Sequence, residues 1–250
     1  MYAPIAVLIV FSFNDSKSRS VWSGFTFKWY QRLFQNAQII NAFTNTLIIA
    51  LVSAIAATVL GTIAAIGITK LNKRTKRLFM NLTNLPMINP EIVTGVSLML
   101  LFVFIYDKFG ILKPGIITLI LSHITFCLPY VVLSVLPKLR QMDKNLYEAA
   151  IDLGCHPIKA FFKVVLPEII PGIVSGMVLS FTLSIDDFVI SYFTSGTTQT
   201  LPLAIYSMTR KIVSPEINAL STILFISVLV LLLLINIGQI KDIKSKERRQ

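Results

Sequence analysis

Three acidic residues, Glu91, Asp186 and Asp187, lie within long apolar runs of this sequence. A carboxylate at the centre of a bilayer costs about 2.5–3.5 kcal/mol on insertion scales, so such residues face a cavity or a partner rather than lipid. No lysine or arginine falls inside these runs to neutralise them. A transmembrane pathway lined by unpaired acids predicts that the protein binds a cation.

Helical geometry assigns different roles to the two adjacent aspartates. Neighbouring residues of a helix point about 100° apart. Asp187 shares a face with a polar stripe made of Ser180, Ser184, Ser191 and Thr194. We therefore expect Asp187 and Ser184 to line the pathway. Asp186 shares its face with apolar residues, so we expect it to serve assembly at the edge of the pathway. Alternatively, both acids pair with bases on a partner subunit.

Glu91 follows two prolines in the segment "NLPMINPEIV", residues 84–93. We expect the helix to break between Pro86 and Pro90 and to restart with Asn89 as its N-cap. Glu91 then lies in the first turn, where the helix dipole favours a negative charge. Broken helices at membrane depth line cavities in transporters, which makes Glu91 a candidate pathway residue. The alternative is a kink in which Glu91 caps its own backbone.

Aromatic rings near these acids suit an organic cation, because ammonium groups bind over ring faces. Tyr192 is the ring that we include in the predicted pathway, and other candidates are Phe126, Tyr130, Phe188 and Phe193. Plain packing is the more common role for each of these rings taken singly.

No catalytic residue, metal site or cofactor is predicted. His123 and Cys127 are four residues apart, as metal ligands could be, but no further ligand lies nearby. We expect them to form a packed polar pair. The chain contains no G-x-x-x-x-G-K-[ST] phosphate loop, so any ATP that drives the protein must be hydrolysed by another chain.

The composition indicates a polytopic membrane protein of the all-α class. Of the 250 residues, 54% are hydrophobic and 14% are charged, against about 25% charged in soluble domains. A helix needs about 20 apolar residues to cross the hydrocarbon core. We expect a single membrane domain over 1–250, with a first span that is short or clipped; the six predicted spans cover 1–13, 46–69, 78–106, 114–136, 171–194 and 217–240.

The 23 basic residues are distributed unevenly between the two sides of the membrane. The segments 70–77, 137–170 and 241–250 hold five each, and the alternate segments hold four, two and two. Basic residues near span ends mark the cytoplasmic side. We therefore expect a multi-pass protein of the cytoplasmic membrane with a cytoplasmic C-terminus. This topology accounts for the net charge of +11, so binding to nucleic acid is not predicted.

The cytoplasmic segment 137–170 has the pattern of two short helices. Asp143 is a plausible N-cap, Gly154 a C-terminal stop, Pro157 the start of the second helix and Pro167 its end. From this pattern alone, the segment is either an interfacial hairpin that lies on membrane lipid or a docking element.

The segment "EAAIDLGCHPIKAFFKVVLP", from Glu148 to Pro167, resembles the EAA loop of ABC importer permeases. It departs from the family pattern at Val164, where isoleucine is usual. The resemblance implies that this loop is a coupling helix that docks on an ATPase subunit. The matching residues are Glu148, Ala149, Ala150, Gly154, Leu166 and Pro167.

Three further segments resemble the spermidine/putrescine permeases within that family: "LSHITFCLPYVV" (121–132), "LSFTLSIDDFV" (179–189) and "LPLAIYSMTRKIVSPEINALSTIL" (201–224). The resemblance implies a non-enzymatic transport subunit that imports polyamines. Its expected partners are a homologous permease, two ATPase subunits and an extracytoplasmic polyamine-binding protein. The alternatives are an ABC permease for another solute, such as a metal cation, and a cation-coupled secondary transporter.

Overall fold

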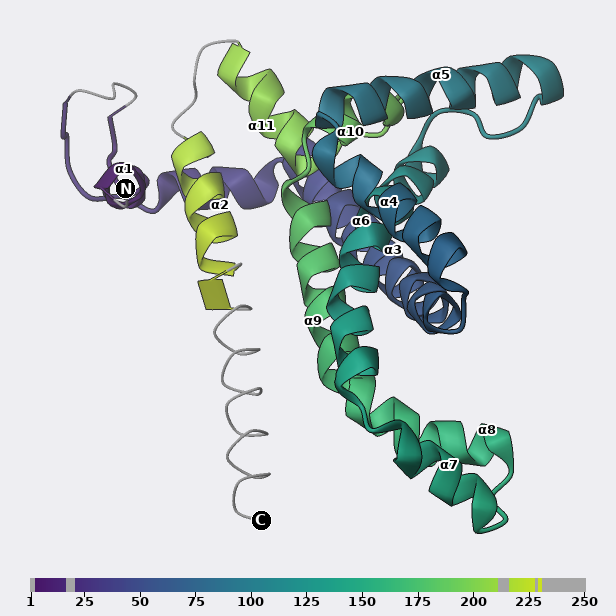
Figure 1. Ribbon diagram of the computed structural model, residues 1–250. Helices are drawn as coiled ribbons and strands as arrows, with labels where there is room; N and C mark the ends of the chain where they lie inside the picture. Colours follow the sequence, from purple (N-terminus) through teal and green to yellow (C-terminus); the bar gives the residue numbers. More distant parts are fainter. Residues whose placement is uncertain (1–2, 17–20, 211–215, 228, 231–250) are drawn as a thin grey trace, which may run out of the picture. The chain divides into compact units, whose positions relative to one another are not determined.

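The computed structural model describes residues 3–16, 21–210, 216–227 and 229–230 of the chain. Within these residues, the single β-type pairing is an isolated bridge between Asn14 and Phe25, and the ordered elements are helices. The predicted all-α fold is therefore confirmed (Figure 1).

The elements follow the chain in a fixed order (Figure 1). They are α1 (Ala3–Phe11), α2 (Lys28–Gln35), α3 (Ala37–Thr69), α4 (Lys73–Ile88), α5 (Glu91–Phe109), α6 (Ile116–Gln141), α7 (Lys144–Asp152), α8 (Pro157–Ala160), a π-turn η1 (Phe161–Val165), α9 (Leu166–Asp186), α10 (Val189–Thr194), α11 (Leu201–Arg210) and a helix over Glu216–Ser227.

Four helical stretches in the described part of the chain are long and apolar enough to cross a membrane, namely α3, α5, α6 and the continuous stretch Pro157–Asp186. They contain or overlap four of the six predicted spans. The first predicted span contains α1, which has 9 residues. The last predicted span, 217–240, overlaps the helix Glu216–Ser227, and most of the rest of this span lies outside the described residues.

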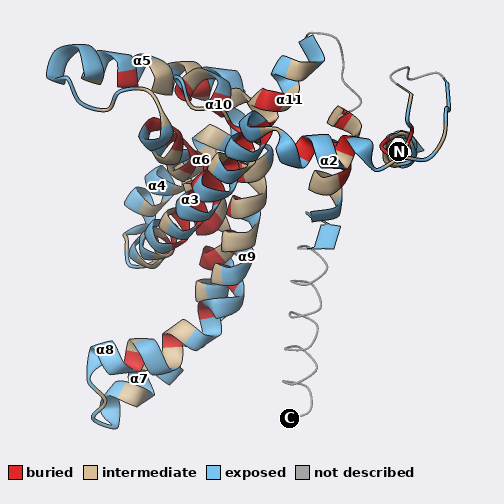
Figure 2. Ribbon diagram, turned by 180° about the vertical axis from the view of Figure 1, so that it is seen from behind, coloured by how far each residue is buried: buried red, intermediate tan, exposed pale blue. Residues whose placement is uncertain are grey.

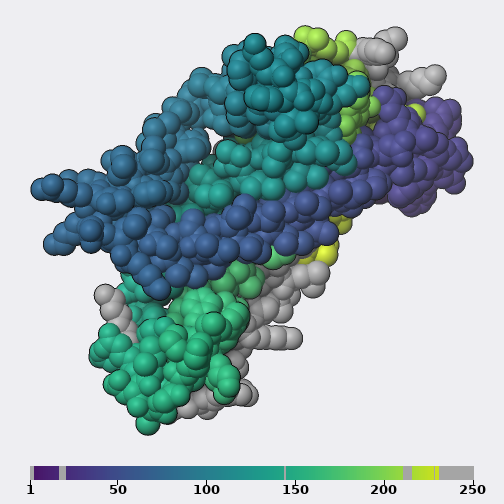
Figure 3. Space-filling model, turned by 90° about the vertical axis from the view of Figure 1, so that its right-hand side faces the viewer, coloured from purple at the N-terminus to yellow at the C-terminus, as the bar shows by residue number. Residues whose placement is uncertain are grey.

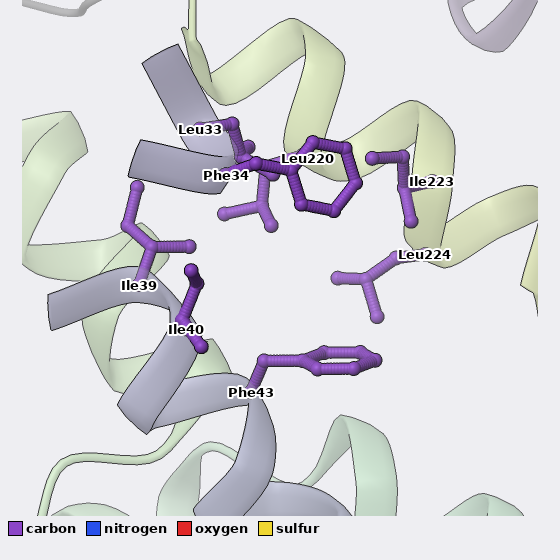
Figure 4. Close-up of a pocket in the computed structure, with 8 residues that line it drawn as sticks. All are labelled: Leu33, Phe34, Ile39, Ile40, Phe43, Leu220, Ile223 and Leu224. Atoms are coloured by element: carbon purple, nitrogen blue, oxygen red, sulfur yellow. The ribbon is translucent and has the colours of Figure 1, made fainter. Parts of the chain in front are cut away.

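The chain divides into two compact units, one formed by Met1–Thr44 with Gln199–Gln250 and the other by Asn45–Thr198. In the first unit, the Trp29 indole donates to the backbone oxygen of Asn14 at 2.7 Å, which fastens α2 to the N-terminal segment. An apolar pocket in the same unit lies between residues 33–43 and the helix Glu216–Ser227 (Figure 4). Its lining residues are Leu33, Phe34, Ile39, Ile40, Phe43, Leu220, Ile223 and Leu224.

The second unit is built around α6, whose side chains form most of its buried core (Figure 2). Residues of α3, α9 and α10 pack against α6 in this core. The members of the core are Ala57, Ala65, Ile68, Phe126, Cys127, Val131, Val132, Val135, Leu136, Ile169 and Ile190. The central helix α6 thus provides the wall on which the broken segment α9–α10 is positioned.

Two glycines allow α9 to approach α6 closely. A Cβ added at Gly172 would lie 2.8 Å from the backbone oxygen of Ser134, and one at Gly176 would lie 3.2 Å from the Cα of Val131. Small residues at four-residue spacing permit such backbone contact between membrane helices. The two helices therefore pack backbone to backbone along this line.

Candidate functional site

The apolar segment that holds the two aspartates is divided into two helices. α9 ends at Asp186, and α10 begins at Val189 after Asp187 adopts an extended conformation, with φ −63° and ψ 119°. The expectation of one continuous helix over 171–194 was wrong. A carboxylate side chain that accepts backbone N–H groups offers the chain an alternative to helical hydrogen bonding.

Asp187 supplies that alternative by capping the first turn of α10. Its carboxylate accepts from the backbone N–H of Ile190 at 3.2 Å and of Ser191 at 2.8 Å, and from the Ser191 hydroxyl at 2.9 Å. These bonds satisfy donors that a helix start leaves without a partner. The carboxylate is consequently engaged with the protein itself, and Asp187 is only 8% exposed.

His123 of α6 joins this cap to the end of α9. Its Nδ1 lies 2.5 Å from the hydroxyl of Ser184, and its Nε2 lies 3.1 Å from the hydroxyl of Ser191 and 3.5 Å from Asp187 Oδ2. The Cys127 thiol, one turn further along α6, donates to the backbone oxygen of Ser180 at 3.4 Å. His123 and Cys127 therefore bind α9 and α10. Their four-residue spacing indicated a shared face, whereas their partners were not predicted.

The polar stripe drawn from the sequence packs against α6. Asp187 and the four hydroxyl residues of the stripe are all buried: Ser180, Ser184, Ser191 and Thr194. At the C-terminal end of the stripe, the backbone oxygen of Thr194 accepts from the Thr118 hydroxyl of α6 at 2.8 Å. The stripe thus forms the contact between α6 and the broken segment within this chain.

The other predicted pathway residues lie on the surface of this unit. Asp186, Glu91 and Tyr192 are exposed, and Tyr192 is 53% exposed. The Tyr192 ring lies 5.7 Å from the Phe188 ring and 5.4 Å from the Phe193 ring, centroid to centroid. An exposed carboxylate at the end of α9 and an aromatic group on α10 therefore flank the helix break.

Glu91 begins α5 at a second helix break, as the sequence predicted. The predicted cap was wrong, because Asn89 ends α4 and Pro90 is the N-cap of α5. α4 also continues through Pro86. Asn89, which precedes Pro90, has the extended conformation that a proline favours in the residue before it, with φ −72° and ψ 140°, so the break falls there; the helix passes Pro86 without a break.

The start of α5 packs on α10, which brings the two breaks into one region. A Cβ added at Gly95, one turn after Glu91, would lie 2.9 Å from Cδ2 of Phe193 and 3.5 Å from the Cα of Ile190. A side chain at this position would require the Phe193 ring to move. Sequence reasoning singled out Glu91 and the aspartates separately, and it did not predict this contact.

The segment 137–170 contains the helix, turn and helix that the sequence predicted. The Asp143 carboxylate accepts from the N–H of Asn145 at 2.9 Å and caps α7. Gly154, with φ +81°, then ends α7 in a Schellman motif, in which Gly154 N–H donates to Ile151 and Cys155 N–H donates to Ala150. Pro157 begins α8.

The end of the second helix was wrongly predicted, because Pro167 does not stop it. Helical structure continues from Pro157 to Asp186. The π-turn over Phe161–Val165 lies directly before Pro167, and the wider turn accommodates the proline ring within the helix. Residues 144–165, which we call the coupling hairpin after the role that the resemblance to the EAA loop implies, are therefore continuous with α9.

The coupling hairpin projects from its unit and carries exposed apolar side chains. Figure 3 shows its green residues extending below the blue helices of the same unit. Leu153 is 89% exposed, and Leu146, Ile158 and Phe162 are also exposed. Exposed apolar side chains of this kind are typical of a surface that contacts another protein or membrane lipid.

The chain matches a known family of membrane proteins over most of its length. Residues 57–239 match the family model described as "Binding-protein-dependent transport system inner membrane component". The chain belongs to this family. It is a permease of an ABC importer, a transport subunit of the inner membrane rather than an enzyme.

Relatives in this permease family cover most of the chain. The putrescine transport system permease PotI of Escherichia coli K12 is 42% identical over 227 residues, or 90% of this chain and 81% of PotI. The spermidine/putrescine permease PotC of the same strain is 42% identical over 234 residues, covering 93% of this chain and 87% of PotC. PotC of Haemophilus influenzae is 40% identical over 235 residues, with 94% and 90% covered.

A solved structure shows the same permease fold. It is a bacterial ABC transporter involved in the import of the acidic polysaccharide alginate. The two structures superpose with a TM-score of 0.73 at 18% identity, and the alignment covers 94% of this chain and 88% of the other chain. The resemblance to ABC importer permeases of the spermidine/putrescine type is therefore confirmed in sequence and, for the permease fold, in structure.

Proposed function

We propose that this permease translocates polyamines, such as putrescine and spermidine, into the cytoplasm. The observation that carries the proposal is the identity of 40–42%, over nine-tenths or more of the chain, to permeases named for putrescine and spermidine transport. The exposed acids fit this substrate, because a polyamine carries several ammonium groups on an apolar stem. No ion pair of Glu91 or Asp186 occurs among the described residues.

We further propose how the pathway residues divide their roles. Asp186, Glu91 and Tyr192 contact the substrate directly, since they are exposed around the two helix breaks. Asp187 and Ser184 act on the pathway from the buried side, where their side chains hold the break in place. Direct contact of Asp187 with substrate remains a prediction, and the aspartate variants in the Discussion test it.

The importer that we propose contains this chain as one permease domain over 1–250. A homologous permease supplies the other half of the pathway, and an extracytoplasmic binding protein delivers polyamine. Two ATPase subunits hydrolyse ATP, and one of them docks on the coupling hairpin of this chain. The exposed apolar residues of that hairpin and the matched residues Glu148, Ala149, Ala150, Gly154, Leu166 and Pro167 support this docking. The basic segments 70–77, 137–170 and 241–250 support a cytoplasmic location of the hairpin and the C-terminus.

The test is uptake of labelled putrescine and spermidine by the reconstituted complex, with ATP supplied or withheld. We expect uptake only with ATP and with the binding protein present. A labelled divalent metal serves as the competing substrate, and an imposed Na⁺ or proton gradient without ATP serves as the competing energy source. Import of the metal in place of both polyamines, or uptake driven by the gradient alone, would contradict the proposal.

A further inference from the structure

His123 touches both sides of the helix break that presents the proposed pathway residues. It lies on α6 with 2% of its surface exposed, in contact with Ser184 before the break and Ser191 after it. We propose that His123 is a positioning residue, which holds α10 against α9 so that Asp186 and Tyr192 keep the orientation needed to bind substrate. This inference rests on the proposed pathway and adds a residue to its machinery.

The hydrogen bonds around His123 form a continuous chain that ends on the carboxylate. The Ser191 hydroxyl donates to Asp187 Oδ2 at 2.9 Å, so its lone pairs can accept from Nε2–H of His123 at 3.1 Å. With the proton on Nε2, Nδ1 accepts from the Ser184 hydroxyl. The hydrogen bonds then run in one direction, from Ser184 through His123 and Ser191 to Asp187. A neutral imidazole is sufficient to complete this series.

α10 cannot hold this position by its own helical stability. It has six residues, and helices shorter than about 12 residues are marginal without tertiary contacts. The Thr118 hydroxyl fastens its C-terminal end at the backbone oxygen of Thr194. His123 and Asp187 fasten its N-terminal end. Loss of His123 therefore removes the side-chain hydrogen bonds that link this end of α10 to α6 and α9, and the Asp187 cap that remains is local to the break itself.

The relative positions of Asp186 and Tyr192 depend on that end of α10. Asp186 is the last residue of α9, immediately before the break. Tyr192 lies one turn into α10, where its N–H donates to the backbone oxygen of Phe188 at 2.8 Å. A change in the direction of α10 displaces Tyr192 relative to Asp186, although His123 touches neither substrate nor these side chains in the proposed mechanism.

Conservative variants of His123 separate positioning from bulk packing. Glutamine places its amide near the position of Nε2 and can still bind Ser191 and Asp187, whereas asparagine reaches only the position of Nδ1. We expect His123→Leu and His123→Asn to raise the KM of polyamine uptake about tenfold or more, with a smaller change in kcat. His123→Gln should stay within about threefold of the wild-type KM.

The matched control is Ser122→Ala, because Ser122 is equally buried on α6 but donates to Thr118 within its own helix. It should leave KM unchanged. Co-purification of all subunits shows that each variant assembles. An unchanged KM in His123→Leu, or equal KM values in the glutamine and asparagine variants, would overturn the inference.

A second measurement does not depend on the transported solute. A cysteine is introduced as Tyr192→Cys in a Cys155→Ser background, and its labelling rate by a charged maleimide is measured in the assembled complex. His123→Leu should change that rate at least fivefold, and His123→Gln should not. If the wild-type complex fails to import polyamines but the labelling rates differ in this way, the proposed substrate is wrong and the positioning role stands. Equal labelling rates in all variants would reject the positioning role.

Discussion

The carboxylate of Asp187 caps α10 through Ser191, whose N–H and hydroxyl lie 2.8 and 2.9 Å from Oδ2. A charged side chain in a membrane span is commonly regarded as a substrate ligand. Here the charge also ends one helix and starts the next, and it leaves its neighbour Asp186 exposed at the break. Two adjacent aspartates thereby take structurally different positions.

The two aspartates should respond differently to loss of charge. Asp187→Asn replaces one of the two carboxylate oxygens by an NH₂ group, so the remaining amide oxygen cannot serve all three of the donors that Ile190 and Ser191 present to Asp187. We expect it to lower the stability of the complex by about 1–3 kcal/mol and to reduce polyamine uptake. Asp186→Asn should leave the melting temperature unchanged and raise the KM for polyamine.

Thermal unfolding, uptake kinetics and co-purification of the subunits check both variants. Loss of the partner permease in Asp186→Asn would instead support the assembly role that the helical face suggested. If Asp187→Asn has normal stability and a raised KM, Asp187 itself contacts the substrate.

Gly172→Ala should weaken the contact between α6 and α9. The added Cβ would lie 2.8 Å from the Ser134 backbone oxygen, which cannot move away without shifting α6. Overpacking of this kind costs about 1–3 kcal/mol. Gly67→Ala is the matched control, because nothing lies within 4 Å of a Cβ at that helical position. Melting temperatures of the purified complexes compare the two, and equal values would refute backbone contact at Gly172.

Gly154→Val should uncouple ATP hydrolysis from transport. Gly154 has φ +81°, which a β-branched residue adopts only with strain. Among the described residues no atom lies within 4 Å of a Cβ at this position, so within this chain the strain is that of the backbone. We expect stimulated ATPase activity to fall severalfold in reconstituted complexes that still contain the variant permease.

Gly154→Asn controls for the turn conformation of the coupling hairpin, because asparagine tolerates positive φ. It should retain most of the coupling. Equal coupling in the valine and wild-type complexes would exclude a role for the Schellman motif in transmission.

Ser180→Ala and Ser191→Ala should differ although both serines are buried in the polar stripe. The Ser180 hydroxyl has no hydrogen-bond partner among the described residues, so its removal should be neutral or slightly stabilising. Ser191 bonds to both Asp187 and His123, and its loss should cost about 1–3 kcal/mol. Chemical denaturation followed by helix content measures the difference. A larger loss for Ser180→Ala would show that its hydroxyl has a partner in the assembled importer.

The sequence was sufficient for features whose causes are local. Proline and glycine act on the backbone within a few residues, so the break before Glu91 and the turn at Gly154 could be predicted. The N-cap at Asp143 follows the same logic, since its carboxylate reaches N–H groups two or three residues away. Apolar runs and basic loops identified a multi-pass membrane protein because these properties depend on composition and not on packing.

Only the tertiary structure decided where the aspartates point. The break at Asp187 has neither proline nor glycine beside it, and it is held by His123, which is 61 residues from Ser184 in the chain. A periodic polar stripe predicts a shared face, but it does not predict whether that face meets a cavity or another helix. The packing of α6 against α9 buries the stripe and leaves Asp186 and Tyr192 exposed. Burial depends on contacts between distant segments, and helical periodicity alone carries no information about them.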